Sequence, residues 1–68
     1  MKLREFLKVV QGNSSVCIRD TEGRTLGYET AVMLRLSRLD LMRRVVANVA
    51  PMGERSFKVT VTPLEATR

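Results

Sequence analysis

Histidine is absent from this chain of 68 residues, and cysteine occurs once, as Cys17. Without an imidazole, the chain lacks the commonest general base, the commonest metal ligand and every Ser–His or Cys–His nucleophile pair. A single cysteine cannot form an internal disulfide, which fits a reducing compartment, and we interpret Cys17 as a small, half-buried strand residue. We therefore expect a protein that is not an enzyme and that has no metal, no cofactor and no small-molecule substrate.

Aromatic residues and long apolar runs are also scarce. The chain has three aromatic residues and no tryptophan, and its longest unbroken apolar run is the four residues from Ala31 to Leu34. A membrane-spanning helix needs about 20 such residues. The N-terminal residues alternate charged with apolar side chains and lack the continuous apolar segment of a secretory signal. We expect no membrane partner and a cytoplasmic location.

Positive charge, and arginine in particular, is abundant. Twelve lysines and arginines face seven aspartates and glutamates, which gives a net charge of +5. The basic residues are scattered, except for a group in the middle of the chain: Arg35, Arg38, Arg43 and Arg44. We interpret this group first as a solvated surface. The alternative is a nucleic-acid-binding site, because guanidinium groups suit phosphates and guanine edges.

The first half of the chain predicts a helix followed by a hairpin. Apolar residues recur at the spacing of one helical face, at Leu3, Phe6, Leu7 and Val10. Residues 14–19 and 24–29 then read as two strands joined by the polar turn 20–23, which a glycine closes. Gly27, inside the second of these strands, indicates a bulge or a close approach of another segment.

The C-terminal third has the clearest alternation of apolar and polar residues. Residues 45–50 and 56–62 alternate with the period of a strand, and the turn-forming residues 51–55 separate them. We predict a second hairpin that ends at Pro63, with residues 64–68 as a tail.

The middle segment, 30–44, is ambiguous. Leucine, methionine and arginine favour a helix. On one helix, however, the apolar positions divide into two opposite groups, Leu34 with Leu41, and Val32 with Leu36 and Leu39. Ser37 and Asp40 have the spacing of a capping box, which would begin a new helical turn. We therefore predict two short helical pieces, 30–36 and 37–42.

The order of helix, hairpin, short helical connector and hairpin predicts an α+β fold, in which the N-terminal helix packs on a small, mostly antiparallel sheet. We expect residues 1–68 to form a single domain. The sheet face under the helix is predicted to carry Val16, Ile18, Val45, Ala47, Val49, Phe57, Val59 and Val61. The other face is weakly polar and is predicted to carry Cys17, Arg19, Val46, Asn48, Ala50, Ser56, Lys58, Thr60 and Thr62. We expect the middle segment or a second copy of the chain to cover part of it.

Taken together, the pattern resembles a loose set of short bacterial and phage or mobile-element proteins of about 70 residues with no known activity. The matching positions are Leu3-x-x-Phe6-Leu7, Val16-x-Ile18-x-Asp20, Gly27, Leu39-x-Leu41, Val46-x-x-Val49-x-Pro51 and Val59-x-Val61. The resemblance spans nearly the whole chain and implies an origin in such elements. It implies no activity and no site residues.

A domain this small buries little apolar surface, so its monomer is expected to be marginally stable and self-association is favoured. We expect a non-catalytic protein-interaction or scaffolding domain, with a second copy or another protein as partner. The residues predicted to make the contact are Leu34, Leu41 and Met42, with Tyr28 at the margin. The alternative remains nucleic-acid binding through Arg35, Arg38, Arg43 and Arg44.

Overall fold

The computed structural model describes residues 1–63, so the predicted tail lies outside the described residues. In chain order the elements are the helix α1 (Leu3–Val9), the strands β1 (Ser15–Arg19) and β2 (Thr25–Thr30), the helix α2 (Ala31–Ser37), the 3₁₀-helix η1 (Leu39–Leu41), and the strands β3 (Val46–Gly53) and β4 (Ser56–Val61). The predicted α+β fold is confirmed.

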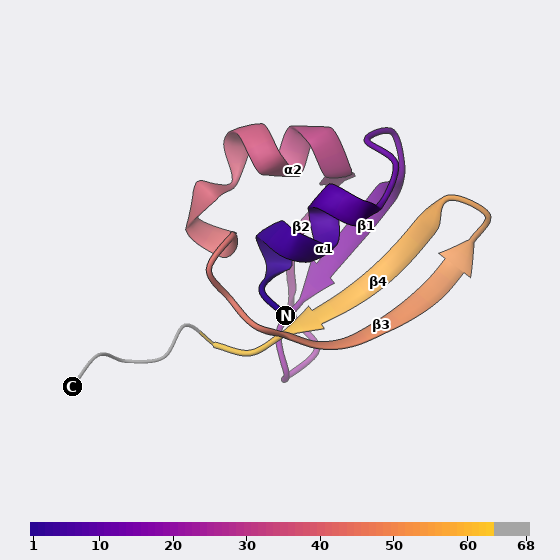
Figure 1. Cartoon of the computed structure of the whole chain (residues 1–68). Helices are drawn as coiled ribbons and strands as arrows, with labels where there is room; N and C mark the ends of the chain where they lie inside the picture. The colour runs from indigo at the N-terminus through magenta and orange to yellow at the C-terminus, as the bar shows by residue number, and fades with distance from the viewer. Residues whose placement is uncertain (64–68) are drawn as a thin grey trace.

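The four strands form one mixed sheet in the order β2-β1-β4-β3 (Figure 1). Each hairpin supplies one antiparallel pair, and the hairpins meet through β1 and β4, which run parallel. In this central pair Val16 lies beside Phe57, and Ile18 lies beside Val59. The connector made of α2 and η1 carries the chain from the edge strand β2 to the other edge strand, β3.

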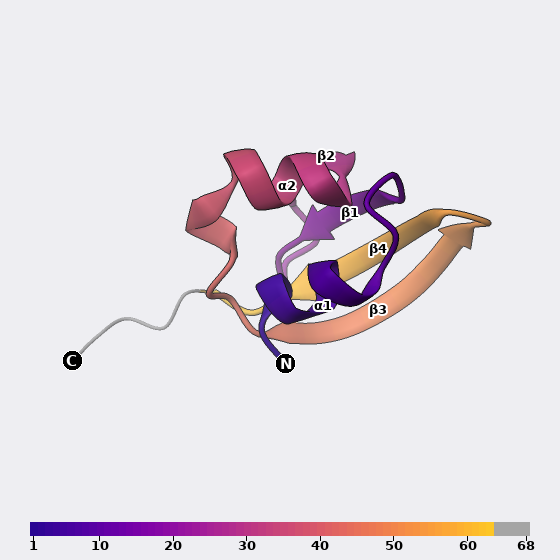
Figure 2. The same ribbon diagram turned by 45° about the horizontal axis from the view of Figure 1, so that its top comes forward.

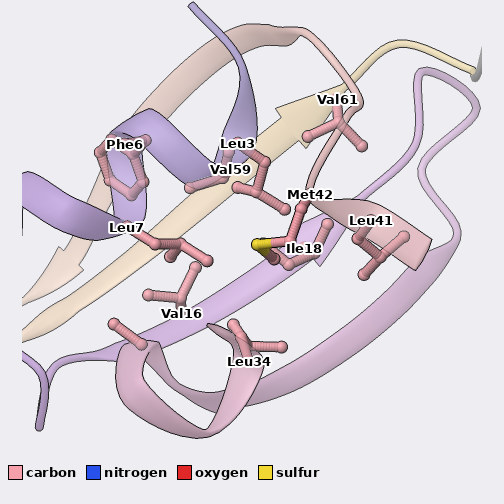
Figure 3. Close-up of a cluster of buried hydrophobic side chains, with 11 residues drawn as sticks. Leu3, Phe6, Leu7, Val16, Ile18, Leu34, Leu41, Met42, Val59 and Val61 are labelled. Atoms are coloured by element: carbon pink, nitrogen blue, oxygen red, sulfur yellow. The ribbon is translucent and has the colours of Figure 1, made fainter. Parts of the chain in front are cut away.

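Both helices lie on the same face of the sheet, and the core fills the space between the two layers (Figures 1 and 2). The buried cluster is Leu3, Phe6, Leu7, Val16, Ile18, Ala31, Leu34, Leu41, Met42, Val59 and Val61 (Figure 3). The rings of Phe6 and Phe57 meet edge to face, with their centroids 6.0 Å apart. Val10 packs against the same cluster, so the predicted apolar face of the first helix is confirmed.

One part of the predicted alternation is wrong. Strict alternation placed Val45 and Ala47 under the helix and Val46 on the opposite face. In the structure Val46 packs against the core, whereas Val45 and Ala47 are exposed. The register of β3 against β4 is irregular between Val46 and Asn48. Such an irregularity inverts the alternation on one side of it, which explains the exchange.

The turn predicted at 51–55 is shorter than expected. β3 continues through Pro51 to Gly53, which leaves only Glu54 and Arg55 between the two strands. Proline has no backbone N–H, but β3 is an edge strand, so its outward side needs no ladder bond. Pro51 and a second register irregularity next to it also make the outer edge of β3 a poor template for another strand.

The two predicted helical pieces of the connector are present, but their boundary differs. α2 runs to Ser37, and the N-cap of η1 is Arg38, whose side chain makes no capping hydrogen bond. The predicted capping box at Ser37 is therefore wrong. The Ser37 hydroxyl instead donates to the backbone carbonyl of Met33, at 2.7 Å, and so belongs to the preceding helix.

Gly27 lies where β2 passes closest to the connector. A Cβ atom at this position would lie 3.3 Å from Nη1 of Arg38 and 3.6 Å from Cδ2 of Leu34. The β2 register is also irregular beside it, opposite Ile18 and Arg19. The close approach predicted from this glycine is confirmed, and it gives the leucines of the connector room to pack on the sheet.

Candidate contact surface

The contact residues predicted from the sequence divide between the core and the surface. Leu34, Leu41 and Met42 are buried, with at most 8% of each residue exposed, and they point into the core (Figure 3). The prediction that these three contact a partner is therefore wrong. Its physical reason is that the connector lies on the same sheet face as α1, where these side chains complete the core. Tyr28 is 59% exposed on β2 and is accessible.

The opposite side of the connector is apolar as well. Four large apolar residues there are 42% to 71% exposed: Val32, Met33, Leu36 and Leu39. Leu36 is four residues after Val32 and three after Met33, so it neighbours both on the surface of α2, and Leu39 begins η1 three residues later. We call these four residues the α2–η1 apolar face.

Local hydrogen bonds hold the connector that presents this face. The hydroxyl of Thr30, the N-cap of α2, accepts from the backbone N–H of Met33 at 3.4 Å. The backbone N–H of Arg38 donates to the carbonyl of Leu34 at 2.9 Å and ends the helix. The apolar face therefore lies on a capped helix rather than on a loop.

The guanidinium of Arg38 ties the connector to the sheet. It donates to both carboxylate oxygens of Asp40, at 3.1 and 3.0 Å, and to the backbone carbonyl of Leu26 in β2, at 2.8 Å. The hydrogen bonds from Arg38 lower the pKa of Asp40, and those to Asp40 raise the pKa of Arg38. The guanidinium of Arg38 thus makes its hydrogen bonds within the fold.

The arginine group predicted as the alternative site is consequently not uniform. Arg38 is hydrogen-bonded to Asp40 and Leu26. Arg44 is half-buried, and its Nε is buried and lacks a hydrogen-bond partner within residues 1–63. Arg35 and Arg43 are exposed. The backbone carbonyl of Arg44 accepts from the N–H of Leu3, which places Arg44 beside the start of α1. Two of the four predicted side chains therefore remain open to solvent.

Asp20 organises the turn between β1 and β2. Its Oδ1 accepts from the backbone N–H groups of Glu22 and Arg24, and its Oδ2 accepts from Nε of Arg24, each at 2.9 Å. These bonds, first among them the one from the Arg24 backbone, lower the pKa of Asp20. Gly23 completes the turn at φ 88°, a conformation that glycine adopts without strain.

We expect the contribution of Asp20 to stability to depend on pH. Because its pKa is lower in the folded chain than in the unfolded chain, the contribution is complete above the unfolded pKa and is lost as the pH falls through the folded pKa. Asp20→Asn should therefore be less stable than the parent chain at neutral pH. The difference in stability should shrink as the pH falls well below 3.8, the ordinary pKa of an aspartate. Urea unfolding at several pH values measures this. A difference that stays constant into strong acid would contradict it.

The thiol of the described chain is enclosed, and the two carboxylates of the first turn are paired. Cys17 is a free, buried thiol that lies beside Tyr28 on one side and Lys58 on the other. A hollow of about 450 Å³ adjoins the first turn, but Asp20 and Glu22 in its wall are both paired with Arg24. Within residues 1–63, no three cysteines, aspartates or glutamates lie close enough together to hold a metal ion.

Neither helix of the described chain has the length and apolar content needed to cross a membrane. Comparison of the sequence with models of protein families, of the sequence with curated proteins, and of the fold with solved structures gives no match.

Proposed function

We propose that this chain is a small, non-catalytic protein-interaction domain that associates with a second copy of itself through the α2–η1 apolar face. One observation carries the proposal: α2 is apolar on two opposite sides. Ala31 and Leu34 pack into the core, and Val32, Met33 and Leu36 face solvent. A soluble helix normally places polar residues on its outer side, and a helix that is apolar all round is usually buried.

The size of the exposed face sets the expected affinity. Fully burying a valine, leucine or methionine side chain contributes about 1.5–3 kcal/mol. With 42% to 71% of each of the four residues exposed, covering the faces of two copies contributes about 7–14 kcal/mol. Association costs about 4–15 kcal/mol in lost freedom of motion. With a cost near the lower end of this range, about 4–7 kcal/mol remains, which corresponds to a weak dimer with a dissociation constant of about 10 µM to 1 mM.

A second copy is the partner that the face fits best. The four residues of the α2–η1 apolar face are uncharged, so their side chains can meet those of a second copy without burying a charge, while the exposed Arg35 of α2 flanks them. Two-fold dimers, in which the same patch serves both copies, are the commonest homo-oligomers. The monomer of 68 residues buries a small core, which association would supplement.

Sedimentation velocity of the parent chain and two variants tests the proposal. Between about 1 µM and 1 mM the sedimentation coefficient of the parent chain should rise with concentration from the monomer value towards the dimer value. Leu36→Glu, which places a carboxylate at the centre of the face in both copies, should remain monomeric throughout. Since Leu36 is 71% exposed, the variant should fold normally.

Val9→Glu is the matched control. Val9 is 75% exposed, and it borders a hollow with Glu54 and Phe57, on the side of the molecule that faces the second hairpin. The variant changes the net charge by the same amount and should associate like the parent chain. Equal loss of association in both variants would show that charge, and not the α2–η1 apolar face, controls association.

A further inference from the structure

The sheet face opposite the helices is not covered by any element of residues 1–63 (Figure 2). The strand register places alternate residues there, including Cys17, Arg19, Tyr28, Asn48, Lys58 and Thr60. Their sequence neighbours Val16, Ile18 and Val59 belong to the core cluster beneath the helices. We call this surface the open sheet face.

The charged residues of the open sheet face, Arg19 and Lys58, are both positive. Arg19 lies beside Thr60, and Lys58 lies beside Cys17, so the two cations are diagonal neighbours on the central strands β1 and β4. Within residues 1–63 neither forms an ion pair, and Nε of Arg19 is buried without a hydrogen-bond partner. The acidic residue of β2, Glu29, pairs with Val16 and so faces the helical layer. A polyanion complements this surface.

An aromatic ring lies in the same row as one of these cations. Cys17 pairs with Tyr28 in β2 and with Lys58 in β4, so Tyr28 and Lys58 are two strand spacings apart, about 10 Å. Tyr28 is 59% exposed, which leaves its ring open to stacking. A base stacked on Tyr28 would leave its neighbouring phosphates within reach of the long side chains of Lys58 and Arg19.

We propose that the open sheet face binds single-stranded nucleic acid, with Tyr28 stacking a base and Arg19 and Lys58 holding phosphates. Proteins that bind single strands on a sheet combine these same two features. Apart from Tyr28, the apolar residues of this face are small, such as the buried Cys17 and the half-buried Ala50, so the face offers little apolar surface to a protein or a membrane. A duplex is disfavoured because, within residues 1–63, both helices lie on the other side of the sheet, so this face has no helix to place in a groove.

Fluorescence anisotropy with a labelled single-stranded oligonucleotide of mixed sequence, as DNA and as RNA, tests the proposal. Binding should be measurable at low salt and should weaken linearly with the logarithm of the salt concentration. Arg19→Gln with Lys58→Gln removes both charges and keeps much of each aliphatic stem over the sheet. It should reduce the salt slope by about 1.4, since each phosphate contact of a single strand contributes about 0.7. Tyr28→Ala should weaken binding about fivefold or more, and Tyr28→Phe should restore it.

The matched control removes two exposed arginines that lie outside the four strands. Arg35→Gln with Arg43→Gln lowers the net charge from +5 to +3, as does the first pair. Its affinity for the oligonucleotide should stay within about twofold of the parent affinity, and that small change reflects the lower net charge. Equal loss in both pairs would overturn the proposal, as would the absence of binding at low salt or indifference to Tyr28→Ala.

This inference is independent of the proposed self-association, because the open sheet face and the α2–η1 apolar face lie on different layers. The monomeric variant Leu36→Glu should therefore still bind the oligonucleotide. The comparison for that variant is Val9→Glu, which has the same net charge. If Leu36→Glu alone loses binding, the nucleic-acid site requires the dimer and its assignment to the open sheet face of one chain is wrong.

Discussion

Replacing Leu34 with alanine should lower the free energy of unfolding by about 2–5 kcal/mol, whereas replacing Leu36 should change it by no more than about 0.5 kcal/mol. The two leucines are two residues apart in α2 and are chemically identical. Leu34 is 0% exposed within the core cluster, whereas Leu36 is 71% exposed. Alanine at position 34 leaves a cavity between the helix and the sheet, and alanine at position 36 removes atoms that contact mainly water.

The difference should be visible in the native state itself. Small domains have stabilities near the low end of about 5–15 kcal/mol, so Leu34→Ala should leave a substantial unfolded fraction at 25 °C. Urea unfolding followed by circular dichroism measures both variants, at a protein concentration of about 1 µM or less so that association contributes little. Similar losses of stability in the two variants would mean that α2 presents a different side to the sheet.

A cysteine at position 36 should form a disulfide with the same cysteine of a second copy. In a two-fold contact a residue near the axis meets its own counterpart, and Leu36 is the centre of the α2–η1 apolar face. A disulfide requires Cα atoms about 4.4–6.8 Å apart, a separation that only residues close to the axis achieve. We expect Leu36→Cys, combined with Cys17→Ala to remove the native thiol, to become mostly covalent dimer under mild oxidation near 1 mM protein.

The control for this experiment is Val9→Cys in the same Cys17→Ala background. Val9 and Leu36 have similar exposure, at 75% and 71%, so their thiols differ in position far more than in accessibility. The Val9→Cys thiol should form covalent dimer at least about tenfold more slowly, at the rate of random collision. Non-reducing gel electrophoresis over time measures both rates. Equal rates at the two positions would contradict a contact centred on Leu36.

Much of the fold follows from periodicity in the sequence. The helical spacing from Leu3 to Val10 and the alternation from Ser56 to Val61 each have one apolar side, so their buried faces can be predicted. The parallel pairing of β1 with β4 is different. It joins residues about 40 positions apart, from Ser15 with Ser56 to Arg19 with Thr60, and no local pattern specifies it.

The contact surface could not be predicted because the connector has two apolar sides. Helical periodicity divides the apolar residues of the connector into two groups, but it does not show which group is buried. Tertiary packing decides this, because Gly27 leaves space for Leu34 and Leu41. The sequence also could not show which arginines of the middle segment are open to solvent. Only the structure shows that Arg38 is hydrogen-bonded to Asp40 and to the carbonyl of Leu26.

The most direct test of self-association through the α2–η1 apolar face is sedimentation velocity of the parent chain beside Leu36→Glu and Val9→Glu. At about 1 mM we predict that about half or more of the chains are dimeric in the parent and in Val9→Glu, and that Leu36→Glu sediments as a folded monomer. A parent chain that remains monomeric at this concentration would contradict the proposal. A Leu36→Glu variant that forms the same dimer would contradict it as well.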